Sequence, residues 1–179
     1  MKALLIIDMQ NVCFRPETPR YEVDAVIDRI NLLSGHFRAA GGRVIFIQHD
    51  GSGEGICIPG TKDWEIVDTL DIAPEDLCIQ KKVNDAFYRS DLLELLKNNT
   101  IDEVVITGCA TDFCVDATVK AALVNDFNVT VVSDGHTTAD RPGLKAKQVI
   151  DHYNWVWSEM YATGGRIRVL DTATCIEGV

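Results

Sequence analysis

Several kinds of segment are missing from this sequence of 179 residues. No apolar run approaches the ~18 residues of a membrane-spanning helix, which argues against a membrane partner. The amino end has only five apolar residues, 3–7, before the first acid. A signal peptide needs an apolar stretch of roughly 7–15 residues and a small-residue cleavage site. We therefore expect a cytoplasmic protein.

Clusters of basic residues are also missing. The chain has 17 Lys and Arg against 27 Asp and Glu, which gives a formal net charge of −10. A chain this acidic repels phosphate backbones, so nucleic-acid binding is disfavoured as its main function. Its length falls within the ~100–200 residues typical of one domain, so we expect a single domain over residues 1–179.

A CxxC cysteine motif and a GxGxxG glycine motif are absent as well. The six cysteines are scattered and form no CxxC pair, which favours free thiols in a reducing compartment. A GxGxxG fingerprint would mark a dinucleotide-binding dehydrogenase, but Asp8-Met9-Gln10-Asn11 stands after the first apolar run instead. That class of oxidoreductase is therefore excluded.

The pattern that is present alternates short apolar runs with amphipathic segments. Continuous Val, Ile and Leu runs are typical of strands buried on both faces, and alternation with helices indicates a parallel sheet. We predict a Rossmann-like three-layer α/β/α sandwich with a six-stranded, mostly parallel sheet. The expected strands are 4–7, 44–47, 77–80, 104–107, 129–132 and 167–170, and the expected helices are 23–37, 91–96, 115–123 and 149–160.

Polar side chains follow several of these strands. In open α/β sheets, ligands bind beyond the carboxyl ends of the strands, where the sequence has an acid, two lysines and a cysteine. Cys114 lies in the first turn of a predicted helix, if Thr111 or Asp112 is the N-cap. The positive end of a helix stabilises a thiolate. A lone cysteine is also typical of a protein core.

Three segments carry a family resemblance. Residues 4–10 (LLIIDMQ), 82–87 (KVNDAF) and 108–115 (GCATDFCV) resemble the isochorismatase-like cysteine hydrolase superfamily, which includes nicotinamidases and N-carbamoylsarcosine amidohydrolases. The three motifs occur in order, each at a predicted strand end, so the resemblance covers nearly the whole chain.

The resemblance implies a catalytic triad of Asp8, Lys82 and Cys114. It also implies an oxyanion hole made by the N–H groups of Ala110 and Cys114, and a cis peptide bond between Cys109 and Ala110. The implied reaction is hydrolysis of an amide or ureido C–N bond in a small molecule, through a thioester, with release of ammonia or an amine. The family is usually oligomeric, which implies a homodimer or a larger homo-oligomer.

One part of the family pattern is missing. Nicotinamidases carry a metal site of one Asp and two His after the second strand, where this chain has His49-Asp50 and no further His until His136. Because a catalytic zinc normally has three protein ligands, we expect no metal and no cofactor, and we do not expect nicotinamide as the main substrate.

Pocket walls are harder to predict. By their positions we expect Phe14, His49, Trp64, Phe87 and Tyr88 to line the site, although each aromatic fits a core position equally.

Arg15, Arg89 and Arg141 are candidate clamps for a substrate carboxylate, although each also fits a surface position. The irregular stretch 50–76 is either a lid or pocket wall, or a surface excursion or subunit contact.

The two tryptophans near the end of the last predicted helix suggest a subunit interface. Trp155 and Trp157 point about 200° apart on a helix, so at least one of them lies outside the core. Besides the hydrolase, the sequence is compatible with a catalytically idle binding module on the same fold. It is also compatible with a thiol redox protein that uses Cys109 and Cys114.

Overall fold

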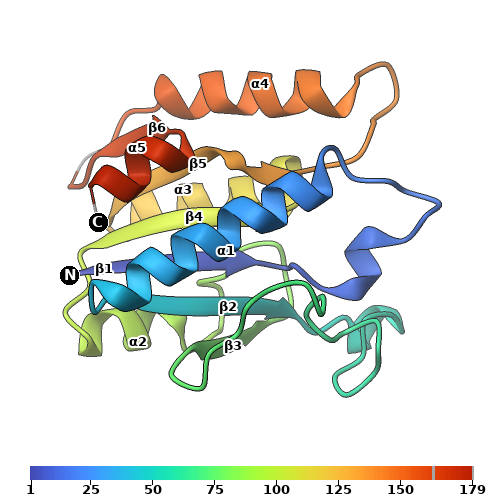
Figure 1. Ribbon diagram of the computed structural model, residues 1–179, viewed down its shortest axis with the longest axis horizontal. Coiled ribbons are helices and arrows are strands. Elements are labelled where there is room, and N and C mark those ends of the chain that lie inside the picture. Colours follow the sequence, from blue (N-terminus) through green and yellow to red (C-terminus); the bar gives the residue numbers. More distant parts are fainter. Residues whose placement is uncertain (163, 179) are drawn as a thin grey trace.

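A parallel sheet of six strands forms the centre of the structure, a computed structural model that describes residues 1–162 and 164–178. The sheet order is β3-β2-β1-β4-β5-β6, and all of its pairings are parallel. The predicted three-layer α/β/α fold is confirmed (Figure 1). The strands are β1 (Lys2–Ile7), β2 (Arg43–His49), β3 (Leu77–Lys81), β4 (Glu103–Cys109), β5 (Asn128–Thr137) and β6 (Ile167–Leu170).

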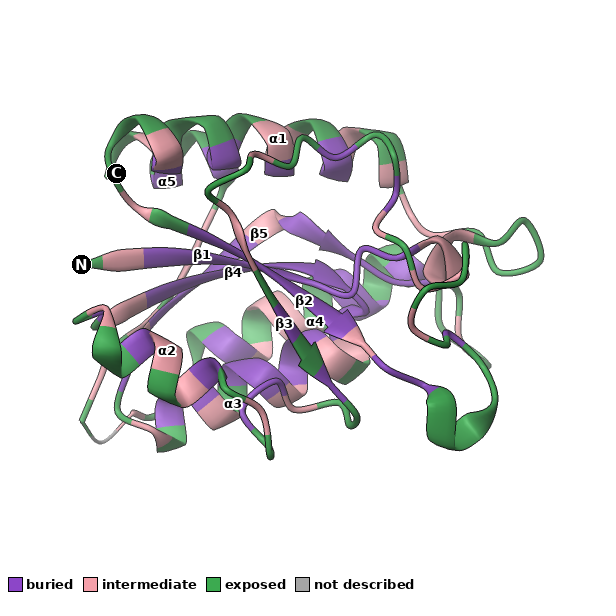
Figure 2. Ribbon diagram, turned by 90° about the horizontal axis from the view of Figure 1, so that it is seen from below, coloured by how far each residue is buried: buried purple, intermediate pink, exposed green. Residues whose placement is uncertain are grey.

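Helices cover both faces of this sheet. One face carries α1 (Val23–Ala39) and α5 (Thr172–Glu177), and the other carries α2 (Leu92–Asn98), α3 (Asp116–Val124) and α4 (Ala146–Ser158) (Figure 2). The sequence pattern missed α5, because six residues are too few to show a helical period. In the described residues, no helix is both long and apolar enough to cross a membrane.

Alternate residues of each central strand enter two separate core layers. In β1, Leu5 and Ile7 pack toward α2, α3 and α4, whereas Leu4 and Ile6 pack toward α1 and α5. All four side chains have no exposed surface. Burial on both faces explains why the strands read as continuous apolar runs rather than as alternating ones.

The last long helix, α4, separates its two tryptophans as predicted. Trp157 is fully buried and donates its indole N–H to Asp116 Oδ1 at 3.0 Å. Trp155 is 62% exposed. The subunit interface suggested by this exposed indole stays a prediction.

The two central strands, β1 and β4, approach each other closely at their carboxyl ends. Gly108 has φ of +116°, and a Cβ atom at this position would lie 2.2 Å from the carbonyl oxygen of Ile7. Only glycine fits both the backbone angle and the space. This contact sets the distance between the segment after β1 and the segment after β4, which together hold the candidate site.

Replacing Gly108 with alanine should therefore lower the free energy of unfolding by more than about 3 kcal/mol, since the clash is with backbone and the φ is strained. Gly35→Ala is the matched control. Gly35 lies in α1 with open space around its Cα, so the change should stabilise the protein by roughly 0.5–1 kcal/mol. Urea unfolding of both variants measures the difference. Equal effects would contradict the close approach.

Candidate active site

The segment after β4 presents Cys114 at the end of the sheet. The peptide bond between Cys109 and Ala110 is cis, at the position that the family resemblance gave it. A single π-helical turn, Thr111–Val115, then leads into α3. Ala110 precedes this turn, so the expectation that Thr111 or Asp112 is the N-cap was wrong. Cys114 still lies within one turn of the helix start.

A buried histidine fixes the start of this turn. Thr111 Oγ1 lies 2.8 Å from His136 Nδ1, and His136 Nε2 lies 3.0 Å from Asn154 Oδ1. Burial lowers the pKa of His136 to about 4, so the ring is neutral at neutral pH. The ring therefore connects the turn that holds Cys114 to β5 and α4 without adding a charge.

The acid, the lysine and the cysteine meet at this point, but the lysine is Lys81. Its ammonium lies 2.7 Å from Asp8 Oδ2 and 3.3 Å from Cys114 Sγ. Lys82 points elsewhere: its side chain is 80% exposed and lies 3.6 Å from Asp50 Oδ2. The prediction of Lys82 in this site was therefore wrong by one position.

The one-residue error has a physical reason in β3. This edge strand is buried on one face only, so Ile79 and Lys81 point into the core while Cys78 and Gln80 point outward. Lys82 lies beyond the strand, where its side chain turns to solvent. The period-2 alternation of residues 77–81 was the signal available in the sequence, and it places Lys81 on the apolar side with Ile79.

The length of a lysine side chain matters for this contact. β3 is separated from β1 by β2, and adjacent strands lie about 4.8 Å apart. Lys81 must therefore extend past β2 to reach Asp8 at the end of β1. Its side chain is fully buried and that of Asp8 is 5% exposed, so this ion pair is shielded from water.

Charge and burial set the resting state of the three groups. Burial opposes a charge on Lys81, but its interactions with the Asp8 carboxylate and, after that, with Cys114 outweigh burial and raise the pKa of the lysine. Burial, reinforced by the Asp8 carboxylate, raises the pKa of Cys114 well above its usual value, although Lys81 acts in the opposite direction. The resting site therefore holds an Asp8–Lys81 ion pair and a protonated thiol.

One oxygen of Asp8 has no partner. Oδ2 accepts from Lys81, whereas Oδ1 is buried and makes no hydrogen bond to any described residue. A buried carboxylate oxygen without a donor is costly, and such an oxygen can accept a proton. The Cys114 thiol is close enough for this carboxylate to affect its pKa.

The predicted oxyanion donors lie beside the thiol. Ala110 O accepts hydrogen bonds from Phe113 N at 3.0 Å and from Val115 N at 3.2 Å. In the described part of the chain, no backbone acceptor outside the π-helical turn is found for the N–H groups of Ala110 and Cys114. Their role in holding an oxyanion stays a prediction.

A cavity of about 340 Å³ opens beside Asp8 and Cys114. This volume suits a small-molecule ligand. His49 lines the cavity, as predicted, and its Nδ1 is buried with no partner among the described residues. The lining consists of Asp8, Gln10, Val12, Cys13, Arg20, His49, Ile56, Cys57, Asn84, Cys109, Ala110, Phe113, Cys114 and Arg141.

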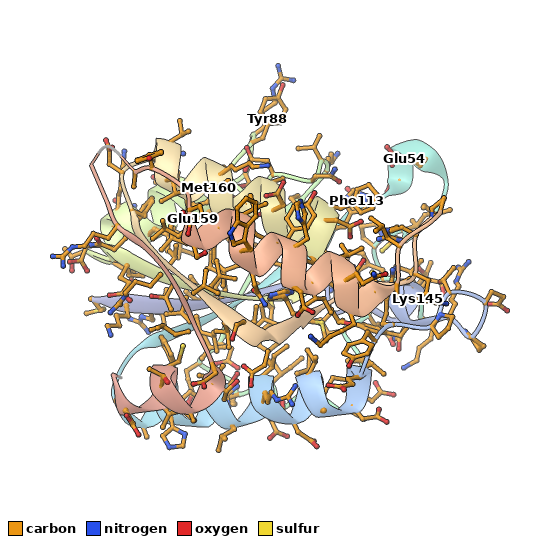
Figure 3. All side chains as sticks on the ribbon, turned by 90° about the horizontal axis from the view of Figure 1, so that it is seen from above. Glu54, Tyr88, Phe113, Lys145, Glu159 and Met160 are labelled. Carbon is orange, nitrogen blue, oxygen red and sulfur yellow. The ribbon has the colours of Figure 1, made fainter. Side chains whose placement is uncertain are left out.

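The four predicted pocket aromatics do not line this cavity. Phe14 packs against the core layer under α1, and Phe87 belongs to the opposite core layer. Tyr88 is exposed at the outer edge of the molecule (Figure 3). The backbone carbonyl of Trp64 accepts from Gln10, but its side chain lies outside the cavity lining. The aromatic that does line the cavity is Phe113, within the π-helical turn that holds Cys114.

Part of the irregular stretch 50–76 forms a wall of the cavity through Ile56 and Cys57. Gln10, which is fully buried, holds this wall in place. Its amide donates to His49 O at 3.1 Å and Trp64 O at 2.8 Å, and its carbonyl accepts from His49 N at 2.8 Å. The wall is therefore attached to the ends of β1 and β2.

The predicted arginine clamps have different environments. Arg15 pairs with Asp63 on the surface, and Arg89 lies over the ring of Tyr88. Arg141 does line the cavity. Sequence reasoning missed Arg20, the other arginine in the lining, because Arg20 belongs to no motif and follows no strand.

The cysteines are free thiols, including Cys109 and Cys114. Cys13, Cys57, Cys109 and Cys114 all line the cavity. A hydrogen bond with Cys109 lowers the pKa of the Cys13 thiol. The structure therefore holds no Cys109–Cys114 disulfide of the kind that the redox alternative would use.

Comparison with known proteins identifies the family of this chain. Residues 2–159 match the Isochorismatase domain, and the chain belongs to the isochorismatase family. A streptothricin hydrolase of Streptomyces noursei is 30% identical over 79% of this chain and 56% of its own length, so the chain spans about half of that relative.

Two further similarities cover larger shares of both this chain and the related protein. A ureidoacrylate amidohydrolase of Methylorubrum extorquens is 26% identical over 86% of this chain and 77% of its own length. A crystal structure of an isochorismatase family protein is 29% identical, with a TM-score of 0.85, and covers 93% of this chain and 97% of that one.

The two neighbouring lysines give a sharp test of the geometry. Lys81→Met leaves the buried Asp8 carboxylate without its partner and should lower the free energy of unfolding by about 3–5 kcal/mol. Lys82→Met removes an exposed side chain and should change it by less than about 0.5 kcal/mol. Urea unfolding at neutral pH compares the two. A larger loss in the Lys82 variant would contradict the assignment of Lys81.

Proposed function

We propose that this protein hydrolyses an amide or ureido C–N bond of a small molecule, with Cys114 as the nucleophile. The observation that carries the proposal is the buried contact of Lys81 with both Asp8 and Cys114 beside the cavity. The names of two relatives, a streptothricin hydrolase and a ureidoacrylate amidohydrolase, support this reaction class.

In the first half of the reaction, Cys114 Sγ attacks the carbonyl carbon of the substrate. Asp8 accepts the thiol proton on its unpartnered Oδ1, acting as general base. The carbonyl oxygen becomes an oxyanion, which the N–H groups of Ala110 and Cys114 stabilise. The C–N bond then breaks, Asp8 returns its proton to the leaving nitrogen, and ammonia or an amine departs from a thioester on Cys114.

In the second half, water attacks the thioester carbonyl while Asp8 takes one of its protons. The C–S bond breaks, the proton returns to sulfur, and the acid product leaves. Lys81 acts throughout by charge. It keeps Asp8 oriented and stabilises the thiolate as it forms, since its ammonium lies 3.3 Å from Sγ. No cofactor takes part in these steps.

Cys114→Ala tests the nucleophile. Ammonia release from a panel of nicotinamide, maleamate and N-carbamoyl amino acids should fall at least ~10³-fold in the variant, because no thioester can form. Intact-protein mass spectrometry after acid quench should detect an acyl adduct on the wild type only, and hydroxylamine should remove it. Undiminished turnover in the variant would exclude Cys114 as the nucleophile. No turnover and no adduct with any compound of the panel would contradict the hydrolase and favour a binding module.

Asp8→Asn tests the acid–base role through its opposite effects on the thiol and on turnover. Because Asp8 raises the pKa of Cys114, its neutralisation should shift the pH midpoint of Cys114 alkylation to lower pH. Iodoacetamide labelling, mapped by peptide mass spectrometry to separate Cys114 from Cys13, measures this shift. Ammonia release should nevertheless fall roughly 10²–10⁴-fold, since proton transfer is lost. An unchanged midpoint, or retained turnover, would remove Asp8 from this role.

A further inference from the structure

The formal charges of the residues around the cavity do not sum to zero. Asp8 is neutralised by Lys81, and Cys114 is a thiol at rest. Arg141 is neutralised by Asp112, to which it donates two hydrogen bonds of 2.7 and 3.0 Å. Arg20 also lines the cavity, and in residues 1–162 and 164–178 it forms no ion pair. The cavity therefore carries one uncompensated positive charge, although the chain as a whole has a net charge of −10.

Arg20 is held in place by the chain around it. Its Nε donates to the carbonyl oxygen of Cys13 at 2.7 Å. Its backbone pairs with Ala139 in an isolated antiparallel bridge, and the next residue, Tyr21, donates its N–H to Thr138 O at 3.0 Å. The two terminal nitrogens of the guanidinium donate to no described residue. Arginine has five N–H donors, so four remain for a ligand.

The charge of the second cavity arginine, Arg141, is already compensated by Asp112. Besides its two bonds to Asp112, the Arg141 guanidinium donates to Thr138 Oγ1 at 2.7 Å and lies 5.0 Å from the ring centroid of Phe113. These contacts use three of its five N–H donors and fix the turn that holds Cys114. Arg141 therefore supports Asp112 and Phe113 with its charge compensated, whereas Arg20 is the cavity arginine without a carboxylate partner among the described residues.

From this difference we infer that Arg20 binds a carboxylate of the substrate, so that the protein selects small amides or ureas that carry a carboxylate. The inference rests on the proposed hydrolase function and names its substrate class. A guanidinium holds a carboxylate through two parallel N–H···O bonds, and the apolar side chains of Val12, Ile56 and Phe113 enclose the rest of the ligand. The net charge of −10 on the whole chain therefore does not describe this cavity.

Binding and turnover of a matched pair of probes test the inference. Succinamate carries a carboxylate, and 4-oxopentanamide has the same chain length with a neutral ketone in its place. In the Cys114→Ala protein, which cannot form a thioester, calorimetry should give a Kd for succinamate that is roughly 10–100-fold lower than that for 4-oxopentanamide. With Cys114 present, kcat/KM for ammonia release should favour succinamate by a similar factor.

Arg20→Met should abolish this preference by weakening succinamate binding and leaving the Kd of 4-oxopentanamide within about twofold. Arg20→Lys keeps the charge without the fork and should retain part of the preference. Arg15→Met is the matched control, because Arg15 lies on the same segment but pairs with Asp63 outside the cavity. This variant should keep the full preference, and near-UV circular dichroism should show that all three variants are folded.

The outcomes separate the two proposals. Equal affinity for the two probes, or a preference that survives in Arg20→Met, overturns the carboxylate subsite, whether or not the amides are hydrolysed. Arg20-dependent binding of succinamate without hydrolysis of either probe supports the subsite and contradicts the hydrolase function. Arg20-dependent binding together with Cys114-dependent hydrolysis of succinamate supports both.

Discussion

The buried ion pair between Asp8 and Lys81 is the interaction on which the candidate site depends. It joins the central strand β1 to the edge strand β3 across the intervening β2, and both side chains are almost completely shielded from water. Two charges in such a place are stable only together. The pair therefore fixes the position of an acid with one free oxygen, and it places a positive charge beside the thiol of Cys114.

The backbone around Cys114 serves the same arrangement. Gly108 lets β4 approach β1 more closely than a side chain would permit. The π-helical turn that follows brings Cys114 back toward the end of β1, and neutral His136 holds the first residue of this turn. A π-helical turn at the start of a helix is less regular than an α-helical one, and such turns are frequent at functional sites.

The charge of the cavity and the charge of the whole chain have different signs. Acidic side chains outnumber basic ones in the chain, yet two carboxylates near the cavity, Asp8 and Asp112, are each paired with a cation. Asp8 forms an ion pair with Lys81, and Asp112 forms one with Arg141, whereas Arg20 forms no ion pair with a described residue. Because close charges in a poorly hydrated cavity interact more strongly than distant surface charges screened by salt, the local balance decides which ligand fits.

The sequence by itself determined the fold. Runs of Val, Ile and Leu separated by amphipathic segments bury their apolar side chains in a parallel sheet that helices cover on both faces. It also indicated Asp8 and Cys114, since the carboxyl ends of such strands meet at one edge. The tertiary structure decided between Lys81 and Lys82, because the alternation of residues 77–81 becomes decisive only once β3 is known to be an edge strand with one buried face. The tertiary structure also showed that the cavity lining includes Arg20 and excludes Phe14, Trp64, Phe87 and Tyr88. The sequence could not predict this, because contacts between distant loops produce no periodic pattern in the chain.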